Sequence, residues 1–113
     1  INVTANTGSI YGVSGTGWGY GLYANRNVTV TSNAGTIKGT SASNRGYGIL
    51  ASTGTVTITS NTGSIIGLST DTGVVVGHAN AVTSNPSSVT ISSNSGLISA
   101  IASAAGSAYA VNA

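Results

Sequence analysis

The stretch VTVTSNAGTIKG, residues 28–39, decides the fold. Its valines alternate with threonines, which is the period-two pattern of a strand with one buried face. Asn33 and Gly35 follow, and both residue types tolerate the backbone conformations of tight turns. The chain should therefore turn there and enter a second short strand, which carries Ile37.

The same phrase occurs three more times, as INVTANTGSIYG from Ile1, VTITSNTGSIIG from Val56 and VTISSNSGLISA from Val89. The starts of the four copies lie 27, 28 and 33 residues apart. A third segment closes each unit, with GYGLYA from Gly19, GYGILA from Gly46, GVVVGH from Gly73 and GSAYAV from Gly106. Three short strands per repeat predict an all-β, parallel β-helix, or β-solenoid. We expect one domain of about four coils, at residues 1–27, 28–55, 56–88 and 89–113.

Stacked coils place equivalent residues on one another at ~4.8 Å. The predicted inward ladders are Ile1, Val28, Val56 and Val89; Val3, Val30, Ile58 and Ile91; Ile10, Ile37, Ile65 and Ile98; and, on the third face, Leu22, Ile49, Val76 and Tyr109. The turns supply a column of Asn6, Asn33, Asn61 and Asn94. Amide side chains in such a column can hydrogen-bond their own turn and the identical amide above. We interpret this column as structural.

The fourth copy leaves an alternative open. Residues 97–111 are rich in alanine, and Leu97, Ile101, Ala105 and Ala108 are spaced as on one face of a helix. A capping helix is therefore the alternative to a fourth coil. The stretch is shorter than the ~20 residues that a membrane-spanning helix needs.

The composition excludes several classes of function. Only 4% of the residues are charged, and Asp71 and His78 are the only carboxylate side chain and the only imidazole. Paired carboxylates for glycoside hydrolysis and a ligand set for calcium are therefore missing. Three basic residues are too few for a nucleic-acid surface. We expect no enzyme, no cofactor, no metal site and no nucleic-acid partner.

Aromatic residues form a further candidate site. Trp18, Tyr20, Tyr23 and Tyr47 should gather on neighbouring coils. Such a cluster either packs as part of the fold or binds sugar rings or a partner chain. Connections of variable length, expected at residues 14–19, 40–45 and 79–88, are the usual places for recognition on a rigid scaffold.

The phrase VTxTSNxGxIxG followed by GYGIxA resembles the repeats of bacterial autotransporter passenger domains and filamentous-haemagglutinin-like adhesins. The resemblance covers nearly the whole chain. It implies a right-handed coil, display outside the cell or on its surface, and a role in adhesion, aggregation or biofilm matrix. It implies no catalytic residues.

Three functions are consistent with these features. The first is an extracellular structural subunit that stacks head to tail with copies of itself into filaments, because neither end carries the polar cap that solenoids normally need. The second is an adhesin fragment that binds a glycan or a host surface through its loops. The third is ice binding by outward threonines such as Thr29, Thr31, Thr57 and Thr59, although this grid decays in the outer coils.

Overall fold

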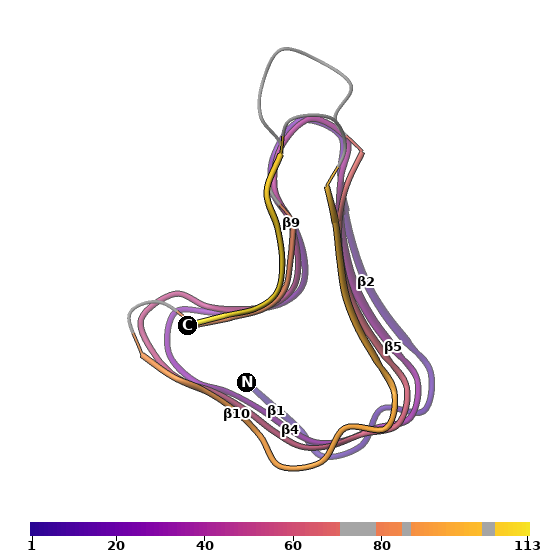
Figure 1. The fold of residues 1–113 in the computed structure, drawn as a ribbon, viewed down its shortest axis with the longest axis vertical. Coiled ribbons are helices and arrows are strands. Elements are labelled where there is room, and N and C mark those ends of the chain that lie inside the picture. The colour runs from indigo at the N-terminus through magenta and orange to yellow at the C-terminus, as the bar shows by residue number, and fades with distance from the viewer. Residues whose placement is uncertain (71–78, 85–86, 103–105) are drawn as a thin grey trace.

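The fold is a parallel β-solenoid, as the repeats predict. The computed structural model describes residues 1–70, 79–84, 87–102 and 106–113. In these residues twelve short strands form three parallel sheets of four strands each. Every coil contributes one strand to each sheet. In Figure 1 the chain runs counterclockwise from β1 to β2 and approaches the viewer, so the coil is right-handed.

The strand order in each sheet follows the order of the coils. Sheet A contains β1 (Asn2–Val3), β4 (Val28–Asn33), β7 (Val56–Asn61) and β10 (Val89–Ile91). Sheet B contains β2 (Ser9–Ser14), β5 (Thr36–Ser41), β8 (Ser64–Ser69) and β11 (Leu97–Ala102). Sheet C contains β3 (Gly19–Ala24), β6 (Gly46–Ala51), β9 (Ala79–Ser84) and β12 (Ala108–Asn112). The view in Figure 1 is along the shortest dimension, 19 Å, which agrees with four layers at ~4.8 Å.

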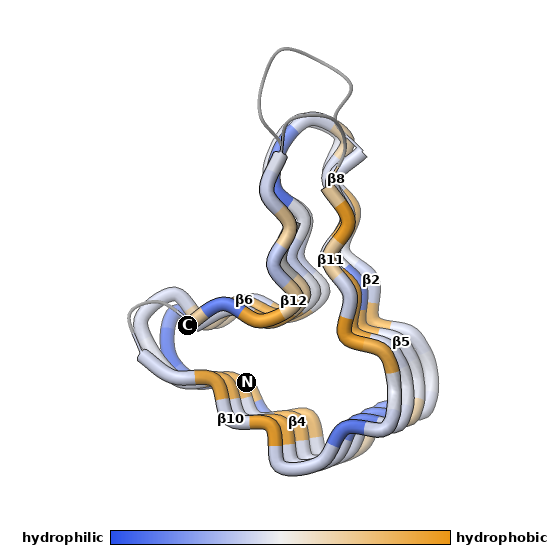
Figure 2. Tube along the Cα trace, viewed as in Figure 1, coloured by the Kyte–Doolittle hydropathy of each residue, from blue (hydrophilic) through white to orange (hydrophobic). Residues whose placement is uncertain are grey.

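The aliphatic core consists of columns of equivalent residues. Val28 pairs with Val56 and Val56 with Val89 in sheet A, and Ile10, Ile37, Ile65 and Ile98 form one column of sheet B. A second column of sheet A holds Val3, Val30, Ile58 and Ile91. Figure 2 shows these columns as superposed apolar segments. The members in the two central coils are buried, whereas those in the outer coils are only partly buried, because a neighbouring coil covers them on one side only.

The predicted third-face ladder is wrong in its last two members. Leu22 pairs with Ile49, Ile49 with Val82 and Val82 with Val111. Val76 lies outside the described residues, and Tyr109 pairs with Asn80 in the neighbouring column. The cause is the length of the connection before β9. Nine residues, 70–78, separate β8 from β9, whereas four separate β2 from β3 and β5 from β6.

The same connection displaces one of the expected loops. Residues 79–84 of the predicted variable loop 79–88 form strand β9 and pair with β6. The alternative prediction of a capping helix at residues 97–111 is also wrong. Strands β11 and β12 pair in parallel with β8 and β9 and continue the solenoid. No helix long and apolar enough to cross a membrane occurs in the described ranges.

Sheets B and C approach each other closely in a narrow upper part of the cross-section, which we call the neck (Figure 1). Glycines make this approach possible. A Cβ atom on Gly39 of β5 would lie 1.8 Å from the carbonyl oxygen of Tyr47, and one on Gly46 of β6 would lie 1.9 Å from that of Leu68. Backbone therefore packs against backbone in the neck, where even a methyl group does not fit.

Replacing Ile65 with Asp should unfold the protein. Ile65 has 0% exposure in the central core, and even truncation of a buried Ile to Ala costs about 2–5 kcal/mol. An ionised carboxylate there would have no partner among apolar neighbours. Thermal unfolding followed by circular dichroism measures the effect. The matched control is Thr59→Asp on the exposed face of β7, which should change stability by only about 0.5 kcal/mol. Equal effects of the two variants would contradict the assigned strand faces.

Gly39→Ala should destabilise the neck by about 1–3 kcal/mol or more, because the sheets must separate to admit the methyl group. Chemical denaturation measures this loss. Gly15→Ala is the control, since a Cβ atom at Gly15 has no neighbour within 4 Å. A Gly39→Ala protein as stable as the parent would show that the neck is wider than the structure has it.

Candidate functional site

The asparagine column is a continuous ladder of side-chain hydrogen bonds. Asn6 Nδ2 donates to Asn33 Oδ1, Asn33 Nδ2 to Asn61 Oδ1, and Asn61 Nδ2 to Asn94 Oδ1, each at 2.7 Å. The two central members are buried, with exposures of 1% for Asn33 and 0% for Asn61. All three amide-to-amide bonds point the same way along the solenoid axis, so the ladder has a direction.

Main-chain bonds lock the turn around each ladder residue. The amide groups of Ala34 and Gly35 both donate to the carbonyl oxygen of Asn6, at 2.8 and 2.9 Å. The next pair of coils repeats the arrangement, with Thr62 and Gly63 donating to Asn33 O. Side-chain and main-chain bonds thus connect each coil to the next at this corner.

The direction of the ladder makes its two ends different. At the first coil, Asn6 donates its Nδ2 to the ladder, and within the described chain no ladder amide precedes it to donate to its Oδ1. At the fourth coil, Asn94 Oδ1 accepts from Asn61, and Asn94 Nδ2 turns to Gly96 O at 3.2 Å. One end face therefore presents an amide acceptor and the other an amide donor.

A column of glycines beside the ladder, Gly8, Gly35, Gly63 and Gly96, lies where one coil stacks too tightly on the preceding one to admit a side chain. A Cβ atom on Gly35 would lie 2.0 Å from Gly8 O, and one on Gly63 would lie 2.0 Å from Gly35 O. Gly96 stands in the same relation to Gly63 O, at 2.1 Å. A Cβ atom on Gly8, in the first coil, would meet nothing within 4 Å. Only the presence of a preceding coil makes this position intolerant of a side chain.

The four aromatic residues selected from the sequence lie together on sheet C and on the connection before it. Tyr20 and Tyr47 are paired in register and stack with ring centroids 5.4 Å apart. Trp18 lies 5.9 Å from Tyr47, and Tyr23 lies 4.8 Å from Tyr20, by the same measure. Arg45 covers Trp18, with its Cζ atom 5.3 Å from the ring centroid, which is a cation–π geometry.

Hydrogen bonds order the connection that carries Trp18. Gly17 N–H donates to Ser14 Oγ at 2.8 Å, and Gly17 O accepts from Ser41 Oγ at 2.6 Å. The next amide group of the strand, that of Gly19, donates to Arg45 O at 2.9 Å. Trp18 is thus held between two fixed residues, although its side chain keeps 46% exposure.

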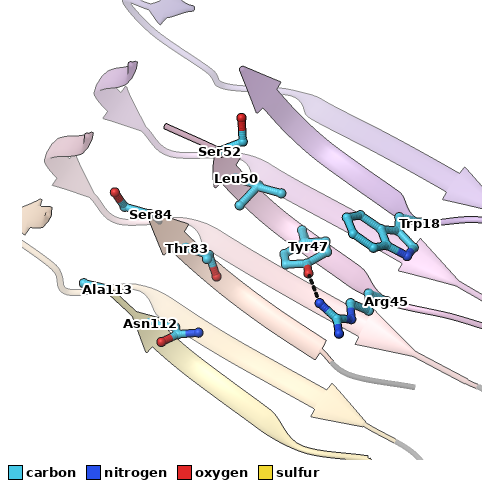
Figure 3. A pocket seen from close by; sticks show the side chains of 9 residues that line it. All are labelled: Trp18, Arg45, Tyr47, Leu50, Ser52, Thr83, Ser84, Asn112 and Ala113. Atoms are coloured by element: carbon cyan, nitrogen blue, oxygen red, sulfur yellow. Dashed lines mark hydrogen bonds between the residues drawn. The ribbon is translucent and has the colours of Figure 1, made fainter. Parts of the chain in front are cut away.

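A pocket of about 350 Å³ lies on this outer face of sheet C, and we call it the elbow pocket because sheet C turns sharply there (Figure 1). Trp18, Arg45 and Tyr47 line one end, and Thr83, Ser84 and Asn112 line the other, with Leu50 between them. Figure 3 shows these side chains spread over successive strands of the sheet. The pocket therefore crosses several coils, with an aromatic end and a polar end.

Thr83 is the unusual residue of the elbow pocket. Its exposure is only 5%, and its Oγ1 atom has no hydrogen-bond partner in the structure. Buried hydroxyl groups nearly always find a partner, and leaving one unpaired is unfavourable. Thr83 is among the residues that line the pocket (Figure 3), so a group that entered the pocket and displaced the atoms covering this hydroxyl group could complete its hydrogen bonding.

The phenol group of Tyr20, which stacks on Tyr47 behind the pocket lining, stays protonated at physiological pH. Burial raises the pKa of Tyr20 above its ordinary value of 10.0, and the neighbouring phenols of Tyr47 and Tyr23 act in the same direction. Arg45 opposes these effects to a smaller extent. Tyr20 therefore presents a neutral ring.

Sequence reasoning missed Arg45 and Thr83. Arg45 had a signal, because WGYGLYA and RGYGILA place Trp18 and Arg45 at the same offset from the strand. The sequence gives no such signal for Thr83. Its pairing with Leu50 depends on the position of β9, and the longer connection in the third coil makes that position unpredictable from the repeat spacing. Asp71 and His78, the only carboxylate side chain and the only imidazole of the sequence, lie outside the described residues. Comparison with known proteins gives no match to a family model, a curated protein or a solved structure.

Asn33→Asp should destabilise the protein by about 3 kcal/mol or more at pH 7, because a buried carboxylate would face acceptors in place of the lost amide donor. The loss should shrink as the pH falls. Burial raises the pKa of such a carboxyl group in the folded state, so the folded state binds the proton more tightly than the unfolded state. Chemical denaturation at several pH values measures both effects.

The control for that series is Asn94→Asp. Asn94 is exposed and still accepts from Asn61 through an oxygen, so the change should be small at every pH. If Asn33→Asp and Asn94→Asp had the same effect, the buried ladder would not contribute as described.

Proposed function

We propose that this chain is a structural β-solenoid subunit that associates end to end with copies of itself into filaments. The observation that carries the proposal is the directional asparagine ladder, whose donor end and acceptor end are complementary. A second copy placed on the fourth coil would bring its Asn6 Oδ1 within reach of Asn94 Nδ2. The ladder would then cross the junction with the geometry that it has between coils of one chain.

The strand edges support the same contact. The outer edges of β10, β11 and β12 and those of β1, β2 and β3 belong to sheets in which every pairing is parallel. Unpaired strand edges are ready templates for another strand. Joining the last coil of one copy to the first coil of the next is a head-to-tail contact, which continues indefinitely because it does not close on itself.

Apolar side chains at the two ends give this contact a driving force. Val3 and Ile10 in the first coil and Ile91 and Ile98 in the fourth are only partly buried, although their equivalents in the central coils are fully buried. A stacked copy would cover them. Burial of apolar surface contributes about 25 cal/mol per Å², and a further coil also satisfies the main-chain groups of each edge.

The setting that fits such a subunit is the cell surface or the surrounding matrix. A chain with 4% charged residues has little electrostatic repulsion to oppose association. The resemblance of its repeats to those of secreted bacterial adhesins favours the same location. The filament would serve there as a scaffold in adhesion or biofilm matrix.

Gly8→Ala should abolish filament growth without harming the fold. A methyl group at Gly8 meets nothing in one copy. In the stack it would collide with the Gly96 carbonyl of the preceding copy, as a methyl group at Gly35 would collide with Gly8 O. Sedimentation velocity over a concentration series and electron microscopy measure assembly, and circular dichroism checks the fold.

Gly15→Ala is the matched control, because the aligned connection of the second coil already carries alanine at this position, Ala42. We expect it to assemble like the parent. The proposal fails if the parent stays monomeric at high concentration and forms no filaments, or if Gly8→Ala assembles as readily as Gly15→Ala.

A further inference from the structure

We propose that the elbow pocket binds a neutral carbohydrate, with a sugar ring on its aromatic end and sugar hydroxyl groups on its polar end. This site lies on the side of the solenoid, so the proposal does not depend on end-to-end association. It also differs from recognition by variable loops, because strands β6, β9 and β12 supply most of the pocket.

The aromatic end offers a preorganised platform. Trp18 is close to half exposed, whereas Tyr47 beneath it is buried and stacked on Tyr20. Arg45 Nη1 donates to Tyr47 Oη at 3.4 Å while its guanidinium group lies over Trp18. These contacts limit the freedom of the rings before any ligand arrives, which lowers the entropy lost on binding. The exposed part of Trp18 is the aromatic surface that remains for the C–H face of a pyranose, because Tyr47 is buried.

The polar end selects for hydroxyl groups. Thr83 lines the pocket, and its Oγ1 is buried and unpaired. A sugar hydroxyl that displaced the atoms covering Oγ1 could both donate to it and accept from it. Asn112 adds an amide group at the same end. Ser84 is already committed, because its Oγ donates to Gly54 O at 2.5 Å. The open hydrogen-bonding capacity is therefore at Thr83 and Asn112.

The charge and the volume of the elbow pocket further restrict the class of ligand that it can bind. The side chains that line the pocket include no carboxylate, and their single cation, Arg45, is already engaged by Trp18 and Tyr47. A phosphate or another strong anion would need more free donors and cations. A volume of about 350 Å³ lies near the lower limit of ~300–1,000 Å³ that is usual for small-molecule sites. A short neutral saccharide satisfies these conditions.

The chain contains one tryptophan, Trp18, so its intrinsic fluorescence reports directly on the pocket. The experiment titrates the full chain with cellobiose, maltose, lactose and N,N′-diacetylchitobiose in turn. It is repeated in the Gly8→Ala variant, so that any effect of association is separated from binding. We expect a saturable change in Trp18 emission with at least one of these sugars, in both proteins.

Thr83→Val then tests the role of the unpaired hydroxyl group. Valine has the same shape but no hydroxyl group, so the affinity for the sugar should fall about tenfold, the equivalent of one good hydrogen bond. The melting temperature should stay the same or rise, because the substitution breaks no hydrogen bond and removes a buried unpaired group. Thr59→Val, the same substitution on the exposed face of sheet A, should leave the affinity unchanged.

Two results would overturn the proposal. One is the absence of a saturable fluorescence change with all four sugars. The other is a Thr83→Val protein that binds the sugar as tightly as the parent and Thr59→Val proteins do.

Discussion

The whole structure depends on the in-register stacking of parallel coils. One coil of this chain has no interior of its own, because its inward valines and isoleucines become covered only when equivalent residues lie above and below them. The main-chain amide and carbonyl groups also depend on neighbouring coils, because their hydrogen-bond partners lie in the next coil and not in the same strand. The difference in burial between Ile65 in the third coil and Ile98 in the fourth shows this dependence within a single molecule.

The asparagine ladder places polar groups in the interior without leaving them unpaired. Each buried amide accepts a hydrogen bond from the coil before it and donates one to the coil after it. Each coil therefore needs an asparagine at the same position in the next coil. An apolar column could stack equally well in either direction along the axis. The amide column cannot, because donor and acceptor differ. Parallel main-chain pairing already gives the solenoid a direction, and the ladder adds complementary side-chain amide groups at its two ends.

The glycines of the GYG segments link the fold to the elbow pocket. Gly46 and its equivalent Gly19 allow the backbones of sheets B and C to touch in the neck, and this contact leaves no room for the intervening tyrosines inside. Tyr47 lines the elbow pocket with Leu50 and Thr83, and Tyr20 stacks on Tyr47. The same short segment thus supplies Gly46 to the close backbone contact between the sheets and Tyr47 to the pocket.

The sequence by itself determined the class of fold, the coil number, the aliphatic columns of sheets A and B and the position of the asparagine ladder. Each of these rests on local alternation and on near-constant spacing between copies, which the chain displays directly. Tertiary structure alone decided the register of the third face, where Val82 and Val111 replace the expected Val76 and Tyr109. It also decided that Thr83 lines the same pocket as Trp18 and Arg45. The physical reason is that hydrogen bonding between coils selects the segment that completes the sheet. Because nine residues separate β8 from β9, and only four separate the equivalent strands of the first two coils, the spacing of the earlier repeats does not predict where β9 begins.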